Sequence, residues 1–116
     1  TKNIHIISNF FDYDKQGKVK GYKGPVIHSH NKREAEIKNS PLYREIAKRR
    51  NIILLGNTLE DLQMSEGMDY NNMLTIGFYN EPDQKNLEAF SRRYDLAILD
   101  DGSMEEINKL LKDITA

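Results

Sequence analysis

The stretch NIILLGNTLEDLQM, residues 51–64, decides the fold. Four successive apolar residues precede Gly56, and a polar segment with two acids follows it. A short run that is apolar at every position predicts a strand buried on both faces, as in a central or parallel strand. The polar segment then leads into a helix. Because ligands of open parallel sheets sit at the carboxyl ends of the strands, this segment is the first place to look for a site.

Working outward, helices and strands alternate along the rest of the chain. A helix is predicted over 41–50, with Ser40 as its N-cap and apolar residues at helical spacing. Strands are predicted over 74–80 and 96–100, with one helix between them and a last helix after Ser103. This alternation implies right-handed crossovers and an α/β, Rossmann-like parallel sheet with helices on both faces.

The N-terminal part has a different pattern. Residues 4–11 (IHIISNFF) predict a strand, and residues 12–19 (DYDKQGKV) supply the charged, glycine-containing turn of a β-hairpin. The segment 30–39 is compatible with a helix but only weakly amphipathic. The predicted fold is therefore a parallel α/β sheet with a β-hairpin near the N-terminus.

Length and composition indicate one domain and limit its partners. The chain has 116 residues, with 18 acids and 17 bases giving a net charge of −1. This balance provides no overall field for nucleic acid or an anionic membrane. The absence of cysteine excludes disulfides and thiolate chemistry. No signal peptide or membrane span is recognisable, so the cytoplasm is the expected compartment. Since the sequence opens on Thr1 and runs almost at once into a predicted strand, we expect it to be a piece of something longer.

The loop after residues 51–56 is a candidate Mg²⁺ site. Gly56 allows a close approach of the backbone, Asn57 offers an amide oxygen, and Asp61 lies four residues further on. Magnesium takes oxygen ligands and few of them from protein. On spacing alone, an ordinary strand-to-helix turn capped by Asn57 or Thr58 is the favoured alternative.

Three other groups of polar residues have side chains that could carry chemistry. The acids of residues 12–14 (DYD) resemble the start of an aspartate-nucleophile phosphatase, but Gln16 replaces the required Thr or Val, so we interpret them as a solvated hairpin tip. His28 and His30 have a spacing that could bind zinc, but no third ligand is apparent, and structural histidines are favoured. Lys32 could hold a phosphate as a point charge, although spacing alone favours a solvated lysine.

Taken together, four segments resemble a known family: SNFFDYDKQGKVKGYKGPVIHSHNK (8–32), NIILLGNTLEDLQMSEGM (51–68), LTIGFYN (74–80) and YDLAILDDGSMEEINKLL (94–111). In order and spacing they are similar to the carboxyl-terminal part of the cytosolic type III 5'-nucleotidases. These are the pyrimidine nucleotidases and their 7-methylguanylate-preferring relatives in the haloacid dehalogenase superfamily. On this resemblance, residues 1–116 are the carboxyl-terminal portion of a haloacid dehalogenase-like core domain.

The resemblance implies a magnesium-dependent phosphatase that converts nucleoside 5'-monophosphates into nucleoside and phosphate through an aspartyl-phosphate. Lys32 matches the family's phosphate-binding lysine. Asn57 stands where the family has the metal-binding aspartate of its GDxxxD motif, and Asp61 matches the second acid, which orients the metal shell or the lysine. His28 and Asn31 match the pattern around the lysine, with no chemistry assigned.

Two departures from the family pattern limit these implications. In the family, the nucleophile, the acid/base aspartate and the base-selecting helical cap all belong to sequence before this segment. We therefore expect the isolated chain to be inactive and its core to be incomplete without the upstream half. Because the cap selects the base, this segment does not indicate which base is preferred. In addition, Asn57 carries no charge, which weakens Mg²⁺ binding. The alternative function is a catalytically inactive module of the same fold that binds a nucleotide or a protein.

Overall fold

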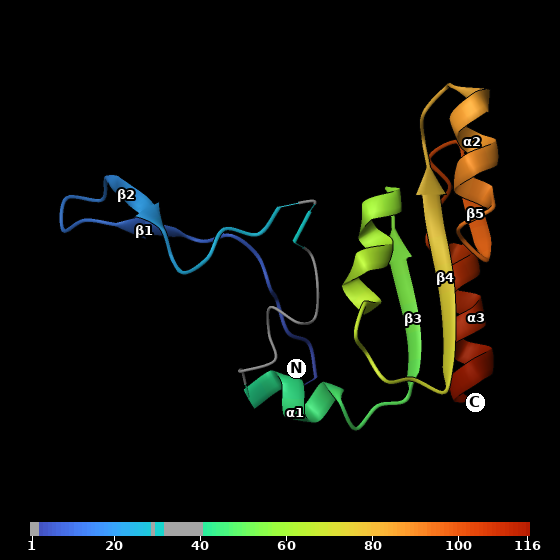
Figure 1. Cartoon of the computed structure of the whole chain (residues 1–116), viewed down its shortest axis with the longest axis horizontal. Helices are drawn as coiled ribbons and strands as arrows, with labels where there is room; N and C mark the ends of the chain where they lie inside the picture. Colours follow the sequence, from blue (N-terminus) through green and yellow to red (C-terminus); the bar gives the residue numbers. More distant parts are fainter. Residues whose placement is uncertain (1–2, 29, 32–40) are drawn as a thin grey trace.

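The computed structural model describes residues 3–28, 30–31 and 41–116. Figure 1 shows a small hairpin at one end of the molecule and a parallel sheet with its helices at the other. In chain order the elements are β1 (Phe11–Tyr13), β2 (Val19–Tyr22), α1 (Pro41–Ile46), β3 (Asn51–Gly56), the 3₁₀ helix η2 (Leu59–Ser65), β4 (Asn72–Tyr79), α2 (Gln84–Ser91), β5 (Leu96–Leu99) and α3 (Glu105–Thr115).

The main sheet confirms the predicted α/β class. Its three strands run in the order β3-β4-β5, and both pairs are parallel, with Leu54 opposite Thr75 and Phe78 opposite Ile98. The sequence pattern predicted a central or parallel strand for residues 51–56, and β3 is parallel to β4 but lies at the edge of this described sheet. Within its apolar run only Leu54 is buried, and Leu55 is 36% exposed. An apolar run reports the capacity of a strand for burial and does not specify which strands pair with it.

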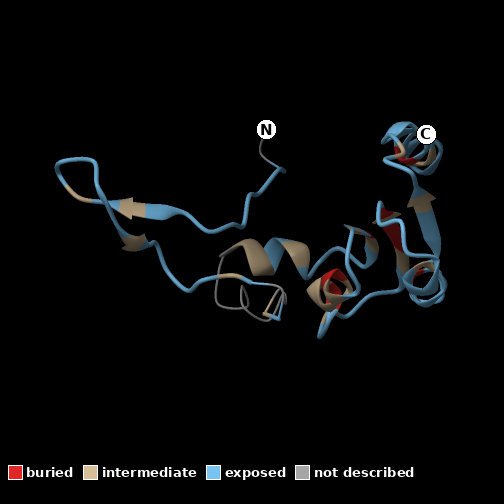
Figure 2. Cartoon of the chain, turned by 90° about the horizontal axis from the view of Figure 1, so that it is seen from above, coloured by how far each residue is buried: buried red, intermediate tan, exposed pale blue. Residues whose placement is uncertain are grey.

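Helices cover both faces of the sheet. On one face, Phe90 of α2 and the following Tyr94 are buried in a cluster with Leu54 and Tyr79. Gly77 of β4 lies under this cluster, because a Cβ atom there would run into the ring of Phe90. The helix α3 lies on the other face, as the view in Figure 2 shows. Successive side chains of β4 point to opposite faces of the sheet, so they face the helices on both sides.

The hairpin is antiparallel and projects away from the sheet (Figure 1). Its turn is as predicted, since Asp14 Oδ1 accepts hydrogen bonds from the backbone amides of Gln16 and Lys18 at 2.8 and 2.9 Å. The predicted strand over 4–11 is wrong, because β1 comprises only Phe11–Tyr13 and residues 4–10 are exposed. Isoleucine favours a strand, but a strand also needs a pairing partner, and none pairs with 4–10 in the described part of the chain.

The helix predicted over 41–50 is shorter than expected. It ends at Ile46, and Arg50 instead forms an ion pair with Asp69, at 2.8 Å between Nη1 and Oδ2. The predicted cap Ser40 lies outside the described residues, as does most of the weak helix over 30–39. Across the described ranges, no helix has the length and apolarity needed to cross a membrane.

The molecule is extended for its length. The radius of gyration is 16.9 Å, compared with about 13 Å for a compact domain of this size. The projecting hairpin and the three-stranded sheet account for this shape (Figure 1). Exposed apolar side chains occur on both, among them Tyr13 at 54% and Leu96 at 49%.

Candidate functional site

The loop between β3 and η2 is held by one buried carboxylate. Asp61 is only 3% exposed, and its Oδ2 accepts hydrogen bonds from the backbone amides of Asn57 at 2.9 Å and Thr58 at 3.1 Å. The structure therefore brings two of the predicted site residues, Asn57 and Asp61, into direct contact. The expected turn is present, but the helix that follows it is 3₁₀ rather than α.

Gly56 makes this loop possible because it leaves room for its neighbours. A Cβ atom at position 56 would lie 2.5 Å from the hydroxyl oxygen of Tyr94 and 2.6 Å from Cβ of Asp61. Real Cβ atoms essentially never approach other atoms so closely. The glycine at the end of β3 is thus required by close packing of two side chains above it.

Tyr94 also holds the loop, through its hydroxyl. Its hydroxyl donates a 2.6 Å hydrogen bond to the carbonyl oxygen of Thr58, although the two residues are 36 positions apart in the sequence. Burial, followed by the negative charges of Asp61 and Glu60, raises the pKa of Tyr94 to about 12. The phenol therefore stays protonated, and remains a donor, throughout the neutral range. The sequence pattern predicts Tyr94 on one helical face with Leu87 and Phe90, but α2 ends at Ser91 and Tyr94 follows it.

The donor groups in the loop fit part of a magnesium site. Asn57 is exposed at the carboxyl end of β3 and carries a neutral amide oxygen, which is an acceptable Mg²⁺ ligand. One Asp61 oxygen is engaged by two amides, so this residue acts on the site by shaping the loop. Within residues 3–28, 30–31 and 41–116, no cluster of three or more His, Asp or Glu side chains could hold a metal ion. A magnesium ion bound at Asn57 would need further ligands from other residues.

The third predicted site residue, Lys32, lies outside the described residues. The segment just before it is tied together by Asn31, whose Oδ1 accepts from the amide of His28 at 2.7 Å and whose Nδ2 donates to the carbonyl of Val26 at 2.9 Å. Asn9 pairs with the backbone of Ile27 through two 2.7 Å hydrogen bonds. These contacts fix the course of the backbone toward position 32.

The two histidines of this segment have a structural contact. The backbone amide of His30 donates to Nδ1 of His28 at 3.2 Å, and the two rings are 6.1 Å apart. A ring nitrogen used in this way is not free to bind zinc. This geometry supports the interpretation of His28 and His30 as structural residues.

The residues after β4 and β5 form turns that are held by local polar contacts. Asn80, after β4, accepts a 3.1 Å hydrogen bond through Oδ1 from the amide of Asp101, after β5. Asp100 and Asp101 have φ angles of 55° and 52°, in the left-handed region. Asparagine and aspartate are the residues that tolerate this conformation best apart from glycine. These polar residues shape the edge of the sheet next to the loop.

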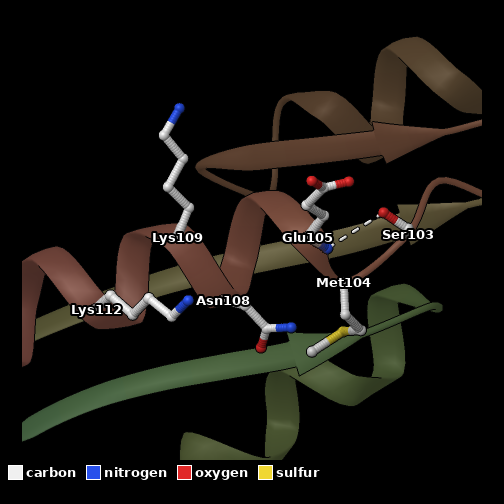
Figure 3. Close-up of a pocket in the computed structure, with 6 residues that line it drawn as sticks. All are labelled: Ser103, Met104, Glu105, Asn108, Lys109 and Lys112. Carbon is white, nitrogen blue, oxygen red and sulfur yellow. Dashed lines mark hydrogen bonds between the residues drawn. The ribbon is translucent and has the colours of Figure 1, made fainter.

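A separate hollow lies along α3 and contains none of the predicted site residues. Figure 3 shows the side chains that line it, which are Ser103, Met104, Glu105, Asn108, Lys109 and Lys112. All of them are exposed and come from the start and one side of α3. The one hydrogen bond drawn there, from the Glu105 amide to Ser103 Oγ at 3.2 Å, holds the beginning of the helix. The hollow is therefore open surface rather than an enclosed ligand site.

The fold and the loop together define a parallel α/β protein whose candidate site lies at the carboxyl end of a strand. Comparison with known families is more specific. A family model described as "Pyrimidine 5'-nucleotidase (UMPH-1)" matches residues 1–115, so the chain belongs to this family. The resemblance seen in the sequence is confirmed.

Individual relatives agree with the family match. The chain is 37% identical over 115 residues to 7-methylguanosine phosphate-specific 5'-nucleotidase B of Xenopus laevis, covering 98% of this chain and 40% of the relative. It is 35% identical over 113 residues to 7-methylguanosine phosphate-specific 5'-nucleotidase of Homo sapiens, covering 97% of this chain and 38% of the relative. The chain thus spans about two fifths of the length of the curated relatives it matches.

A solved structure shares the arrangement of the whole chain. It is the crystal structure of cytosolic 5'-nucleotidase IIIB bound to cytidine, with a TM-score of 0.84 and 27% identity. The match covers 97% of this chain and 38% of the other. Since the alignment includes nearly every residue, the extended shape and projecting hairpin occur within a larger experimentally solved protein.

Proposed function

We propose that this chain is the carboxyl-terminal portion of a magnesium-dependent 5'-nucleotidase that converts nucleoside 5'-monophosphates into nucleoside and phosphate. The family match over residues 1–115 carries this proposal. The names of the relatives support a nucleotide substrate, and the cytidine in the similar solved structure supports a nucleoside site. The loop built from Gly56, Asn57 and Asp61 supports a metal-binding role for this edge of the sheet.

Each site residue has a distinct proposed role. Lys32 binds the phosphate as a point charge, Asn57 offers its amide oxygen to Mg²⁺, and Asp61 holds the loop that presents Asn57. Mg²⁺, when bound, stabilises negative charge on the phosphoryl oxygens. The aspartate that forms the aspartyl-phosphate lies outside this chain. Residues 1–116 alone therefore lack the nucleophile, and we expect them to release no phosphate.

The rest of the protein is the proposed partner of the exposed sheet. The outer edge of β3 pairs with no strand among the described residues, and apolar side chains such as Leu55 are exposed beside it. Open edges and apolar faces of this kind are normally covered. We propose that the upstream half completes the core domain there. We also propose that the protein works in the cytoplasm, as the name of the similar solved structure suggests. Neither nucleic acid nor a membrane is part of the proposed function.

The test is phosphate release from CMP, UMP and 7-methyl-GMP, with Mg²⁺, by the full-length protein that contains this sequence. Turnover by the full-length protein, its loss in Lys32→Ala, and its retention in the control Lys20→Ala would support the enzyme. Lys20 is a suitable control because it contacts Asp12 on the exposed hairpin. Turnover by the isolated chain would contradict the proposed division of the site.

Asn57 supports one alternative, which is a module that binds nucleotide without turnover. The uncharged side chain weakens electrostatic binding of the ion, by several kcal/mol at most in a partly desolvated site. Asn57→Asp should therefore lower the Mg²⁺ concentration for half-maximal activity at least about tenfold. Asn108→Asp on exposed α3 adds the same charge as a control. Tight nucleotide binding with no turnover, even after Asn57→Asp, would favour the inactive module over the enzyme.

A further inference from the structure

The position of Asn57 depends on a residue that lies far from it in the sequence. Thr58, the next residue, is held on both sides, because its amide donates to Asp61 Oδ2 at 3.1 Å and its carbonyl accepts from the Tyr94 hydroxyl at 2.6 Å. The amide of Asn57 also donates to Asp61, at 2.9 Å. The backbone that carries the exposed Asn57 side chain is therefore fixed from two directions.

Tyr94 is well suited to hold the loop in place. It is 4% exposed, and its ring packs against Phe90 with centroids 4.5 Å apart, inside the cluster that includes Leu54 of β3. Its hydroxyl reaches over Gly56, where no Cβ atom could fit. A rigid ring anchored in the core thus places one hydrogen-bond donor directly on the loop.

We propose that Tyr94 is a positioning residue for the metal loop, and that its hydroxyl, acting through the Thr58 carbonyl, sets the direction in which Asn57 presents its amide oxygen. This inference rests on the proposed function of the loop in Mg²⁺ binding. The core itself needs only the aromatic ring, which phenylalanine would also supply. The hydroxyl therefore acts on the loop, and removing it tests this role with little change in packing.

The same core contains a matched control. Tyr79 is 7% exposed, belongs to the same cluster, and donates its hydroxyl to the carbonyl of Asp83 at 2.6 Å. That bond lies at the start of α2 and does not touch the loop. Tyr94→Phe and Tyr79→Phe each remove one tyrosine-to-carbonyl hydrogen bond of equal length. Only the first of these bonds ends on the residue next to Asn57.

The experiment compares both variants in the full-length protein by measuring phosphate release as a function of Mg²⁺ concentration. Tyr94→Phe should raise the Mg²⁺ concentration for half-maximal rate about three- to tenfold, while the rate at saturating Mg²⁺ falls by less than about twofold. Tyr79→Phe should leave the half-saturating concentration within about twofold. An equal Mg²⁺ dependence for the two variants would overturn the positioning role.

Amide hydrogen exchange separates this inference from the proposed function. The amides of Asn57 and Thr58 should exchange about tenfold faster in Tyr94→Phe than in Tyr79→Phe, because of the two tyrosine hydroxyls only that of Tyr94 bonds to the loop. If the unmodified protein releases no phosphate, the proposed function fails, and the exchange rates alone decide the inference. Equal exchange of these two amides in the two variants would then overturn it.

Discussion

Replacing Gly56 with alanine should destabilise the protein, although the same change is often stabilising elsewhere. The added Cβ would lie 2.5 Å from the hydroxyl oxygen of Tyr94 and 2.6 Å from Cβ of Asp61. Neither side chain can withdraw freely, since Asp61 holds two amides and Tyr94 is fixed by the core and by Thr58. The loop must therefore shift.

The size of the effect follows from three contributions. Overpacking in a fixed environment costs about 1–3 kcal/mol. Losing the hydrogen bond between Tyr94 and Thr58 costs about 0.5–1.5 kcal/mol more. Alanine reduces the entropy of the unfolded chain, which returns about 0.4–1 kcal/mol. We therefore expect Gly56→Ala to lower the free energy of unfolding by about 2 kcal/mol, within bounds of about 0.5–4 kcal/mol.

The assay is urea denaturation of the full-length protein, followed by circular dichroism. Gly21→Ala in β2 is the control, because a Cβ atom there meets nothing within 4 Å. We expect its free energy of unfolding to stay within about 0.5 kcal/mol of the unmodified protein. A Gly56→Ala protein as stable as Gly21→Ala would refute the claim that the loop is closely packed.

A double variant identifies the neighbour responsible. Tyr94→Phe removes the oxygen atom that the new Cβ would approach most closely. The combined cost of Gly56→Ala and Tyr94→Phe should therefore be smaller than the sum of the two single costs, by about 0.5–1 kcal/mol. Additive costs would show that the hydroxyl is not the obstacle.

Three further predictions concern other contacts. Asp95→Ala removes the acceptor for the Thr75 amide and hydroxyl, both at 2.8 Å. It should lower the free energy of unfolding, measured in urea, by about 2–3 kcal/mol. The loss should be smaller in a Thr75→Val background, where the hydroxyl is already absent. Because burial raises the pKa of Tyr94 from 10.0 to about 12 on folding, the free energy of unfolding should fall as the pH rises from about 10 to about 12, where the unfolded chain loses this proton and the folded chain keeps it. Tyr94→Phe should remove that part of the alkaline loss of stability in urea denaturation. Asn9→Ala should speed amide exchange of Ile27 about tenfold, since it deletes both 2.7 Å bonds between the two residues; unchanged exchange would show that Asn9 does not hold this segment.

The elements after residue 50 could be predicted because local patterns specify them. The apolar run 52–55 forms a parallel strand, and Phe90 of α2 lies in the core cluster as its helical spacing indicated. Tyr94 also lies in that cluster, but beyond the end of α2 at Ser91. Ser103 does bond to the start of α3, although that helix begins at Glu105, one residue later than a helix capped by Ser103 would. Spacing within one element was sufficient in these cases.

Pairing between elements could not be predicted in the same way. Residues 4–10 have the composition of a strand, but composition does not show whether a partner strand is available. The apolar run of β3 predicts a central or parallel strand, and the structure shows a parallel strand at the edge of the described sheet. Local sequence does not specify which strands are neighbours in space.

The sequence predicted two residues of the loop but not the side chain that holds its backbone. Asp61 and Asn57 were singled out by their place after a strand, and the structure brings them together. Tyr94 escaped notice because its hydroxyl contacts a backbone carbonyl 36 residues away. A tyrosine in an apolar pattern gives no sign in the sequence that its hydroxyl bonds to a distant backbone carbonyl. The role of Lys32 stays a prediction.

The hydrogen bond from Tyr94 to Thr58 also has a consequence for the order of folding. It spans 36 residues, which include η2, β4 and α2, and long-range contacts form only after the entropy of closing the intervening chain has been overcome. The turn after β3 can begin locally through Asp61. Its final shape has to wait until β4 has paired and α2 has docked, so the site matures in the last stage of folding rather than the first.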